Sequence, residues 1–464
     1  MWTFTAEFAT FERKKFASLS HEANKAMNLN SYIGLMGRSF RFDETPNGTV
    51  LREVVDGYAD LEVPDTEFLL TLDADSLLLR EYCLRLVQLM DQPEHQRVAV
   101  AQTPYSAFRG AGTRIERLAG ATTDIQHILH QGMTRFDATF WVGANAVIRK
   151  SALDDIVEIE QQGGFEVRRY VQDRTVIEDT ESSIDLGRHG WTLLNYPERL
   201  SYSATPPDFG SLVVQRRRWA NGGLLILPKL WREARQRRRD NRPMGTTEVL
   251  IRVNYMASIA WASFGLVFLL AFPYDSRLLS PFVLGAALPY FLAMASDLRS
   301  MGYRGTDVIR IYGFNLILLP VNLAGVLKSL QQAFTGKKIP FARTPKVKDR
   351  TATPIPYLVA PLLIIAFSAF TFVRDVTEEN WANAAFAAVN ALLTAAATIS
   401  YIGLGTMIVD FGVGLARWLF VERPVRRAPA PEVESAPDWR VVLYTGGTPA
   451  GETDRDRDEL EVAA

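Results

Sequence analysis

Residues 67–76 read Glu-Phe-Leu-Leu-Thr-Leu-Asp-Ala-Asp-Ser, an apolar run that ends in two carboxylates. The run Phe68–Leu72 predicts a buried parallel strand, and residues 77–90 after it have a helical pattern. In open α/β sheets, ligands bind at the carboxyl ends of the strands. Asp73 and Asp75 therefore lie where a hard divalent cation could be shared with a diphosphate. Asp-x-Asp alone is a weak signal, and a helix N-cap at Asp75 or Ser76 is the alternative.

Two further polar motifs follow, each beside a run that predicts regular structure. Gly143-Ala144-Asn145 leads into Ala-Val-Ile-Arg, which predicts a turn and then a short strand. Glu178-Asp179 precedes a helical pattern that ends at Gly190. A carboxylate at such a place could remove a proton from an acceptor hydroxyl. The alternative for this acid pair is helix capping, because acids near a helix N-terminus complement its dipole.

The motif Gln215-Arg216-Arg217-Arg218-Trp219 has a spacing that suits one face of a helix. Gln215 lies three residues before Arg218 and four before Trp219, so the three side chains are neighbours on a helical surface. A tryptophan ring can stack on a sugar, and a guanidinium can bind a diphosphate. The alternative is a basic helix at a membrane surface with an interfacial tryptophan. The motif alone leaves both open.

The composition bears on which classes of partner and site the sequence supports. The chain has 464 residues, with 51 basic and 52 acidic side chains, so its charge gives no argument for a nucleic-acid partner. Cys83 is the only cysteine, which excludes an intrachain disulfide and a cysteine-based zinc cluster. The first 20 residues lack the apolar core of a signal peptide. We therefore expect the first half of the chain to face the cytosol.

Residues 250–416 are largely apolar, unlike the charged first half. A spanning helix needs about 20 mostly apolar residues, and five stretches come near that length: 252–272, 279–297, 308–331, 355–373 and 384–409. If all five crossed, the basic stretch 336–350 would lie outside, against the tendency of Lys and Arg to stay cytoplasmic. We therefore expect four spans, with 308–331 along the inner interface, and five spans as the alternative.

Taken in order, these motifs resemble those of family 2 glycosyltransferases of the cellulose, chitin and hyaluronan synthase kind. The resemblance includes Phe341-x-x-Thr344-x-Lys346, which follows the stretch 308–331, and Lys25-Ala-Met-Asn-Leu-Asn near the start. It runs from about Lys25 to about Lys346. Gln-x-x-Arg-Trp together with the earlier Glu-Asp pair is its most specific part.

The resemblance implies a GT-A-like α/β domain on the cytosolic side of an α-helical transmembrane domain. It implies that Asp73 and Asp75 hold Mg²⁺ or Mn²⁺ on the nucleotide diphosphate. Asp179 would be the general base, and Glu178 would help to fix its loop. The residues that it implies for substrate binding, the last three of them in a gating loop, are Lys25, Asn145, Gln215, Arg218, Trp219, Phe341, Thr344 and Lys346.

The chain departs from the family pattern at its front. The family's catalytic domain begins with two strands and an Asp-Asp-Gly-type motif, and here only 24 residues precede Lys25. We therefore expect an N-terminally incomplete GT-A-like domain. The expected layout is a glycosyltransferase domain at 1–209, an amphipathic interfacial helix region at 210–245, a transmembrane channel domain at 246–416 with a gating loop at 336–350, and a disordered cytosolic tail at 417–464.

The expected reaction is inverting transfer of a hexose from a nucleotide sugar, taken to be UDP-linked, to a growing β-glycan. The product would then cross the membrane. The expected partners are the nucleotide sugar, the glycan acceptor, the lipid bilayer and synthase accessory subunits, with no nucleic acid, and the expected location is the plasma (inner) membrane. Two alternatives stay open: a non-processive membrane transferase that acts on a lipid-linked acceptor, and an inactive homologue that serves as a membrane partner subunit.

Overall fold

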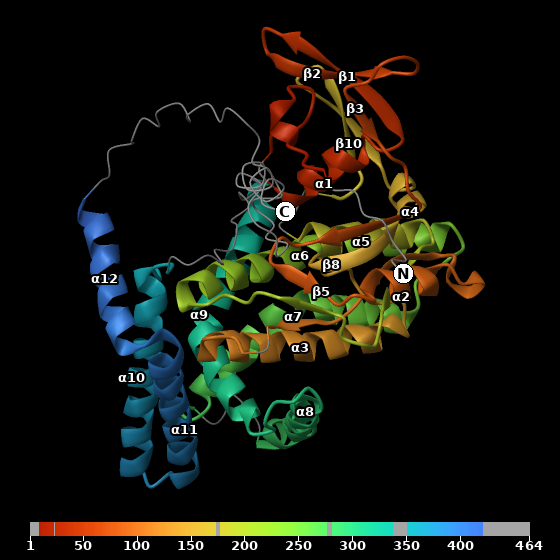
Figure 1. The fold of residues 1–464 in the computed structure, drawn as a ribbon. Coiled ribbons are helices and arrows are strands. Elements are labelled where there is room, and N and C mark those ends of the chain that lie inside the picture. The colour runs from red at the N-terminus through yellow and green to blue at the C-terminus, as the bar shows by residue number, and fades with distance from the viewer. Residues whose placement is uncertain are drawn as a thin grey trace, which may run out of the picture. The chain divides into compact units, whose positions relative to one another are not determined.

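The computed structural model describes residues 9–22, 24–108, 110–172, 177–275, 281–336 and 350–420. The chain divides into two units, of which Arg13–Ala416 holds nearly all of these residues. Figure 1 shows the helices and strands of this unit. All contacts given below lie within it.

A four-stranded mixed sheet forms the centre of the N-terminal half. Its order is β11-β6-β8-β4. β11 (Thr192–Asn195) is parallel to β6 (Val98–Gln102), whereas β8 (Asn145–Arg149) is antiparallel to both β6 and β4 (Phe68–Leu72). Every residue of β6 and β8 is buried, which agrees with their central place in the sheet.

The position of β4 corrects the prediction of a buried parallel strand. β4 pairs with β8 in antiparallel fashion and lies at the edge of the described sheet. Leu70 and Leu72 are 39% and 43% exposed, because an edge strand is covered less completely than a central one. A continuous apolar run indicates a strand, but it carries no information on the direction of its neighbour.

The segment after Asp75 also differs from the prediction. Residues Ser76–Leu78 form β5, which pairs with β12 (Ser201–Ser203), and β12 pairs in turn with β7 (Tyr105–Ala107). Helix α2 begins only at Tyr82 and ends at Met90. Asp75 therefore ends a turn between two strands and caps no helix.

The remaining strands form two small antiparallel sheets, β2-β1-β3 and β9-β10. Their bounds are β1 Arg38–Thr45, β2 Gly48–Val54, β3 Leu61–Val63, β9 Glu158–Gln162 and β10 Phe165–Arg169. The shorter helices of this half are η1 Arg13–Lys15, α1 Lys25–Ile33, η2 Pro93–His95, α4 Lys150–Asp154 and α5 Glu178–Arg188.

Two long helices connect the sheet to the apolar part of the chain. α3 (Arg114–Thr134) starts at a capping box formed by Thr113 and Glu116, and α6 (Phe209–Arg239) is capped by Asp208. Buried side chains of both helices share one hydrophobic core with the later helices: Ile115, Leu118, Phe209, Leu212, Phe314, Ile317 and Tyr357. The sheet domain and the apolar helices are therefore packed together through α3 and α6.

Four helical segments in the described part of the chain are long and apolar enough to cross a membrane. They are α7 (Thr246–Ala271), α9 (Asp307–Thr335), α10 (Ile355–Thr377) and the segment Trp381–Ile402, which joins α11 (Trp381–Ala397) to a π-helical turn (Thr398–Ile402). Together with the mixed sheet, these helices confirm the predicted combination of an α/β domain with long apolar helices.

The segments that qualify differ in part from the predicted spans. α9 contains the stretch 308–331 that we expect at the interface, and 50% of its most apolar window is buried in the protein. Gly325 of α9 lies so close to α6 that a Cβ would be 2.5 Å from Ala220 Cβ. The predicted span 279–297 falls on α8 (Pro281–Ser300). The predicted span 384–409 is interrupted at Gly403, after which α12 (Leu404–Leu419) begins.

Candidate active site

Lys25, at the start of α1, links two turns that lie at the end of the central sheet. Its Nζ donates hydrogen bonds to Asp73 Oδ1 and to the carbonyl oxygen of Gly143. The amide of Asp73 donates to the carbonyl oxygen of Ala144 over 2.8 Å. The Asp-x-Asp turn and the turn before β8 are therefore adjacent, and Lys25 places a positive charge between them.

The turn at Gly143 leaves room for the carboxylate of Asp179. Gly143 has φ +75°, and a Cβ on it would lie 2.3 Å from Asp179 Oδ2. Glycine suits this position both for its backbone conformation and for the space that it leaves.

Asn145, the first residue of β8, brings an unsatisfied amide to the same end of the sheet. It is 1% exposed, and neither polar atom of its side chain has a hydrogen-bond partner among the described residues. Buried amides are normally hydrogen-bonded, so such an exception requires an explanation.

Glu178 and Asp179 are the first two residues of helix α5. The acid pair therefore lies at a helix N-terminus, which is the alternative that the sequence offered. Asp179 Oδ1 accepts a 2.7 Å hydrogen bond from the amide of Thr180. The positive end of the helix dipole favours the ionised carboxylates at this position. The helix therefore holds Asp179 with Oδ2 directed towards the Gly143 turn.

Burial nevertheless raises the pKa values of both carboxyl groups. Burial raises the pKa of Glu178 to about 7, and the negative charge of Asp179 adds to this rise. Burial likewise raises the pKa of Asp179. The Thr180 amide, Lys25 and Arg218 favour the ionised form and oppose this rise. A carboxylate whose pKa lies closer to the working pH is a better general base than an ordinary aspartate.

Helix α6 brings the Gln-x-x-Arg-Trp motif to this acid pair. Gly222 packs so tightly against Ile177, the residue before the pair, that a Cβ would lie 2.5 Å from Ile177 Cγ1. Arg218, one turn earlier on α6, is close enough to oppose the rise in the pKa of Glu178. The predicted helix for this motif is confirmed, and one helix carries Gln215, Arg218 and Trp219.

Gln102 and Ser183 hold the segment that leads into the glycine turn, and neither was predicted from the sequence. Gln102 Oε1 accepts a 3.0 Å bond from the amide of Val142, and its Nε2 donates to the carbonyl oxygen of Phe140 over 2.8 Å. Ser183 Oγ accepts a 2.9 Å bond from the amide of Trp141. The one sequence signal was a glutamine at the end of the otherwise apolar run Val98–Gln102.

Tyr105, on β7, is a further residue near the site that the sequence did not reveal. Burial raises the pKa of its hydroxyl, and the charges of Asp73 and Asp179 add to the rise. The phenol therefore lies within electrostatic reach of both carboxylates. A lone tyrosine in a short strand gives no sequence signal for such a position.

Asp73 and Asp75 are the carboxylates that could hold a divalent cation. The described residues contain no group of three or more His, Cys, Asp and Glu side chains arranged to hold a metal ion. Mg²⁺ is commonly held by one or two carboxylates together with substrate phosphates, so two carboxylates suit an ion that arrives with a nucleotide diphosphate. Lys25 bonds to Oδ1 of Asp73, and the lysine and the cation would share this carboxylate.

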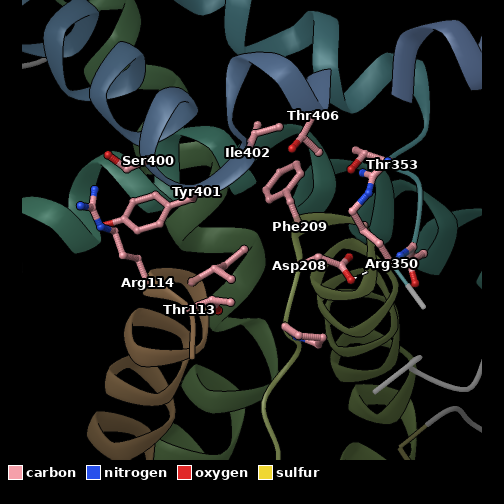
Figure 2. Close-up of a pocket in the computed structure, with 14 residues that line it drawn as sticks. Thr113, Arg114, Asp208, Phe209, Arg350, Thr353, Ser400, Tyr401, Ile402 and Thr406 are labelled. Atoms are coloured by element: carbon pink, nitrogen blue, oxygen red, sulfur yellow. Dashed lines mark hydrogen bonds between the residues drawn. The ribbon is translucent and has the colours of Figure 1, made fainter. Parts of the chain in front are cut away.

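Phe341, Thr344 and Lys346 lie outside the described residues. The chain is described again from Arg350, beside a polar cavity of about 220 Å³ between α3, α6 and α12 (Figure 2). Arg350 pairs with the buried Asp410 at 2.6 Å, and Asp410 also accepts a 2.9 Å bond from the amide of Thr353. On the other side, Asp208 accepts a 3.3 Å bond from the amide of Thr351. Residues 350–353 therefore connect the first turn of α6 to α12.

The family model of glycosyl transferase family group 2 matches residues 68–294, from β4 into α8. The chain belongs to glycosyltransferase family 2. The matched residues include the Asp-x-Asp turn, the glycine turn, the acid pair and the Gln-x-x-Arg-Trp helix. Most of the geometry described above therefore lies within the matched region and surrounds the candidate active site.

Sequence similarity relates the transferase distantly to cellulose synthases. It is 27% identical to cellulose synthase 1 of Komagataeibacter xylinus over 168 residues, which are 35% of this chain and 10% of that protein. It is 28% identical to a UDP-forming cellulose synthase of Dictyostelium discoideum over 162 residues, which are 35% of this chain and 14% of that protein. The chain thus matches only a small part of the length of these relatives.

A solved structure that resembles the transferase is the mannosyltransferase PcManGT of Pyrobaculum calidifontis, determined in complex with GDP-Man and Mn²⁺. The two share 16% sequence identity with a TM-score of 0.30, over 57% of this chain and 62% of that chain.

Proposed function

We propose that this transferase moves a hexose from a UDP-linked sugar, with inversion, to the end of a growing β-glycan. The observation that carries the proposal is the place of Asp179. Its carboxylate faces the Gly143 turn, which Lys25 ties to Asp73, and burial raises its pKa. A carboxylate that can serve as a base thus lies near the Asp-x-Asp turn at the end of β4, which supports this role. The UDP-forming relatives support uridine as the donor nucleotide.

In the proposed reaction, Asp179 takes the proton of the acceptor hydroxyl while that oxygen attacks the anomeric carbon of the donor. The bond between this carbon and the diphosphate oxygen breaks, and the nucleoside diphosphate leaves from the opposite face, which inverts the anomeric configuration. Arg218 neutralises charge on the leaving group. Asp73 and Asp75 would hold a divalent cation, which supplies further charge neutralisation when bound.

The remaining parts of the proposal concern the membrane. We propose that Gln215 and Trp219 bind the acceptor end of the glycan and that Asn145 bonds to substrate. The loop with Phe341, Thr344 and Lys346 would cover the loaded site, and the apolar helices would pass the product across the plasma (inner) membrane. The distribution of basic residues supports a cytosolic catalytic domain.

A vesicle assay tests this proposal. Membranes that contain the transferase are supplied with Mn²⁺ and a panel of UDP-sugars, and both the rate and the product length are measured. We expect one UDP-sugar to yield a polymer and Asp179→Asn to reduce the rate by at least 100-fold, since general bases contribute about 10²–10⁴-fold. Asp137→Asn makes the same charge change at a residue outside the site. Full activity of Asp179→Asn would sink the proposed base, and addition of a single sugar would sink the polymerase.

A further inference from the structure

Arg216, an unassigned position within the Gln-x-x-Arg-Trp motif, makes two specific contacts in the site. Its Nη2 donates a 2.8 Å hydrogen bond to Thr122 Oγ1 on α3. Its guanidinium carbon lies 4.7 Å from the centre of the Trp219 ring, one helical turn further along α6. The side chain thus lies between α3 and the indole.

Among the residues that the structure describes, the guanidinium has no acidic partner at this place. No Asp or Glu side chain pairs with Arg216 among the described residues, and its Nε has no hydrogen-bond partner there. Burial lowers the pKa of Arg216 to about 10, and the nearby Tyr105 opposes this change. Arg216 is half-buried, and partly burying a charge without a counter-ion is unfavourable. This cost opposes the contact between the guanidinium and the indole.

The neighbouring Arg217 shows that this contact belongs to one arginine of the run. The Arg217 guanidinium points to another element, with its carbon 5.9 Å from the centre of the Tyr357 ring on α10. A planar guanidinium stacks on an aromatic face and can donate a hydrogen bond at its edge at the same time. Arg216 makes both kinds of contact, so it can restrain the orientation of the indole.

We propose that Arg216 is a positioning residue that holds the Trp219 ring, through its stack and its bond to Thr122, in the orientation that receives the terminal sugar of the acceptor. This inference rests on the proposed function, which assigns Trp219 to the acceptor. A role on the leaving diphosphate is the competing interpretation, and it predicts an effect on the nucleotide sugar instead.

The kinetic test compares three variants of the full chain in vesicles, with the active UDP-sugar and a short oligosaccharide acceptor. Arg216→Gln should raise the KM for the acceptor about tenfold, the size of a cation–π contact of intermediate strength, and leave the KM for the UDP-sugar within twofold. Thr122→Val should also raise the KM for the acceptor, by a smaller factor than Arg216→Gln. Arg217→Gln, with the same change of charge, should leave the acceptor KM within twofold. A rise in the KM for the UDP-sugar alone would overturn the proposal.

A second measurement does not depend on transfer activity. The fluorescence of Trp219 is obtained as the difference between the protein and its Trp219→Phe variant, and its quenching by acrylamide is recorded. We expect Arg216→Gln to increase the quenching of this component and Arg217→Gln to leave it unchanged. Unchanged quenching in Arg216→Gln would overturn the positioning role. If the wild type transfers no sugar but the quenching responds as expected, the proposed function fails while the role of Arg216 in holding the ring stands.

Discussion

Gly143→Ala should reduce the catalytic rate of this transferase strongly while reducing its stability only slightly. The new methyl group would lie 2.3 Å from Asp179 Oδ2 and 3.1 Å from its Cγ, well inside contact distance. The obstructing atoms are the end of a side chain that can rotate, so the carboxylate would move away by about 1 Å or more. Misplacing a reacting group by about 1 Å can reduce the rate by about 100-fold. We therefore expect kcat to fall by about two orders of magnitude.

The expected cost to stability is much smaller. A non-glycine residue at a positive φ costs about 1–2 kcal/mol, and the displaced carboxylate adds little because it can turn away. Gly132→Ala is the matched control, because nothing lies within 4 Å of a Cβ there and the residue is inside helix α3. The assay is the initial transfer rate in vesicles, with thermal unfolding of the purified protein beside it. A Gly143→Ala rate within twofold of the wild type would refute the contact between this turn and the base.

Four further outcomes are expected. Transfer should weaken on acidification well above pH ~4, the usual range of an aspartate, because burial raises the pKa of Asp179, and the pH dependence of kcat checks this. The effect on stability has the opposite sign. Because the pKa of Asp179 is higher in the folded than in the unfolded state, its carboxyl group contributes stability below the unfolded pKa, and this stability is lost as pH rises through the folded pKa. Asp179→Asn should therefore raise the melting temperature at neutral pH. Asp410→Asn should lower the free energy of unfolding by about 1–3 kcal/mol, since Arg350 loses its buried partner, and denaturant unfolding measures it. EDTA should abolish transfer, and Asp75→Asn should raise the Mn²⁺ concentration that restores it in the same assay.

Local sequence patterns determined the elements that carry the motifs. The strand Asn145–Arg149 follows from its β-branched and apolar residues, and the helix at Glu178–Arg188 follows from its acids at the start and glycine at the end. The helix that carries Gln215 and Trp219 follows from the spacing of these motif residues, which suits one helical face. Such features depend on neighbours a few residues apart, so they can be read without knowledge of the fold.

Long-range packing decided the direction of β4 and the arrangement of the site. Lys25 and Gly143 are 118 residues apart in the chain, yet one hydrogen bond joins them. The burial of the Asn145 amide and the contact between the glycine turn and Asp179 require distant segments to meet at the end of the sheet.

The Gln-x-x-Arg-Trp motif shows, within five residues, the same difference between what local sequence determines and what long-range packing decides. The sequence by itself determined that Gln215, Arg218 and Trp219 share a helical surface, because helical periodicity alone sets that relation. Only the tertiary structure decided that Arg216 points to Thr122 and Arg217 to Tyr357. The physical reason is that adjacent residues on a helix face directions about 100° apart, and the elements packed against each direction come from elsewhere in the chain.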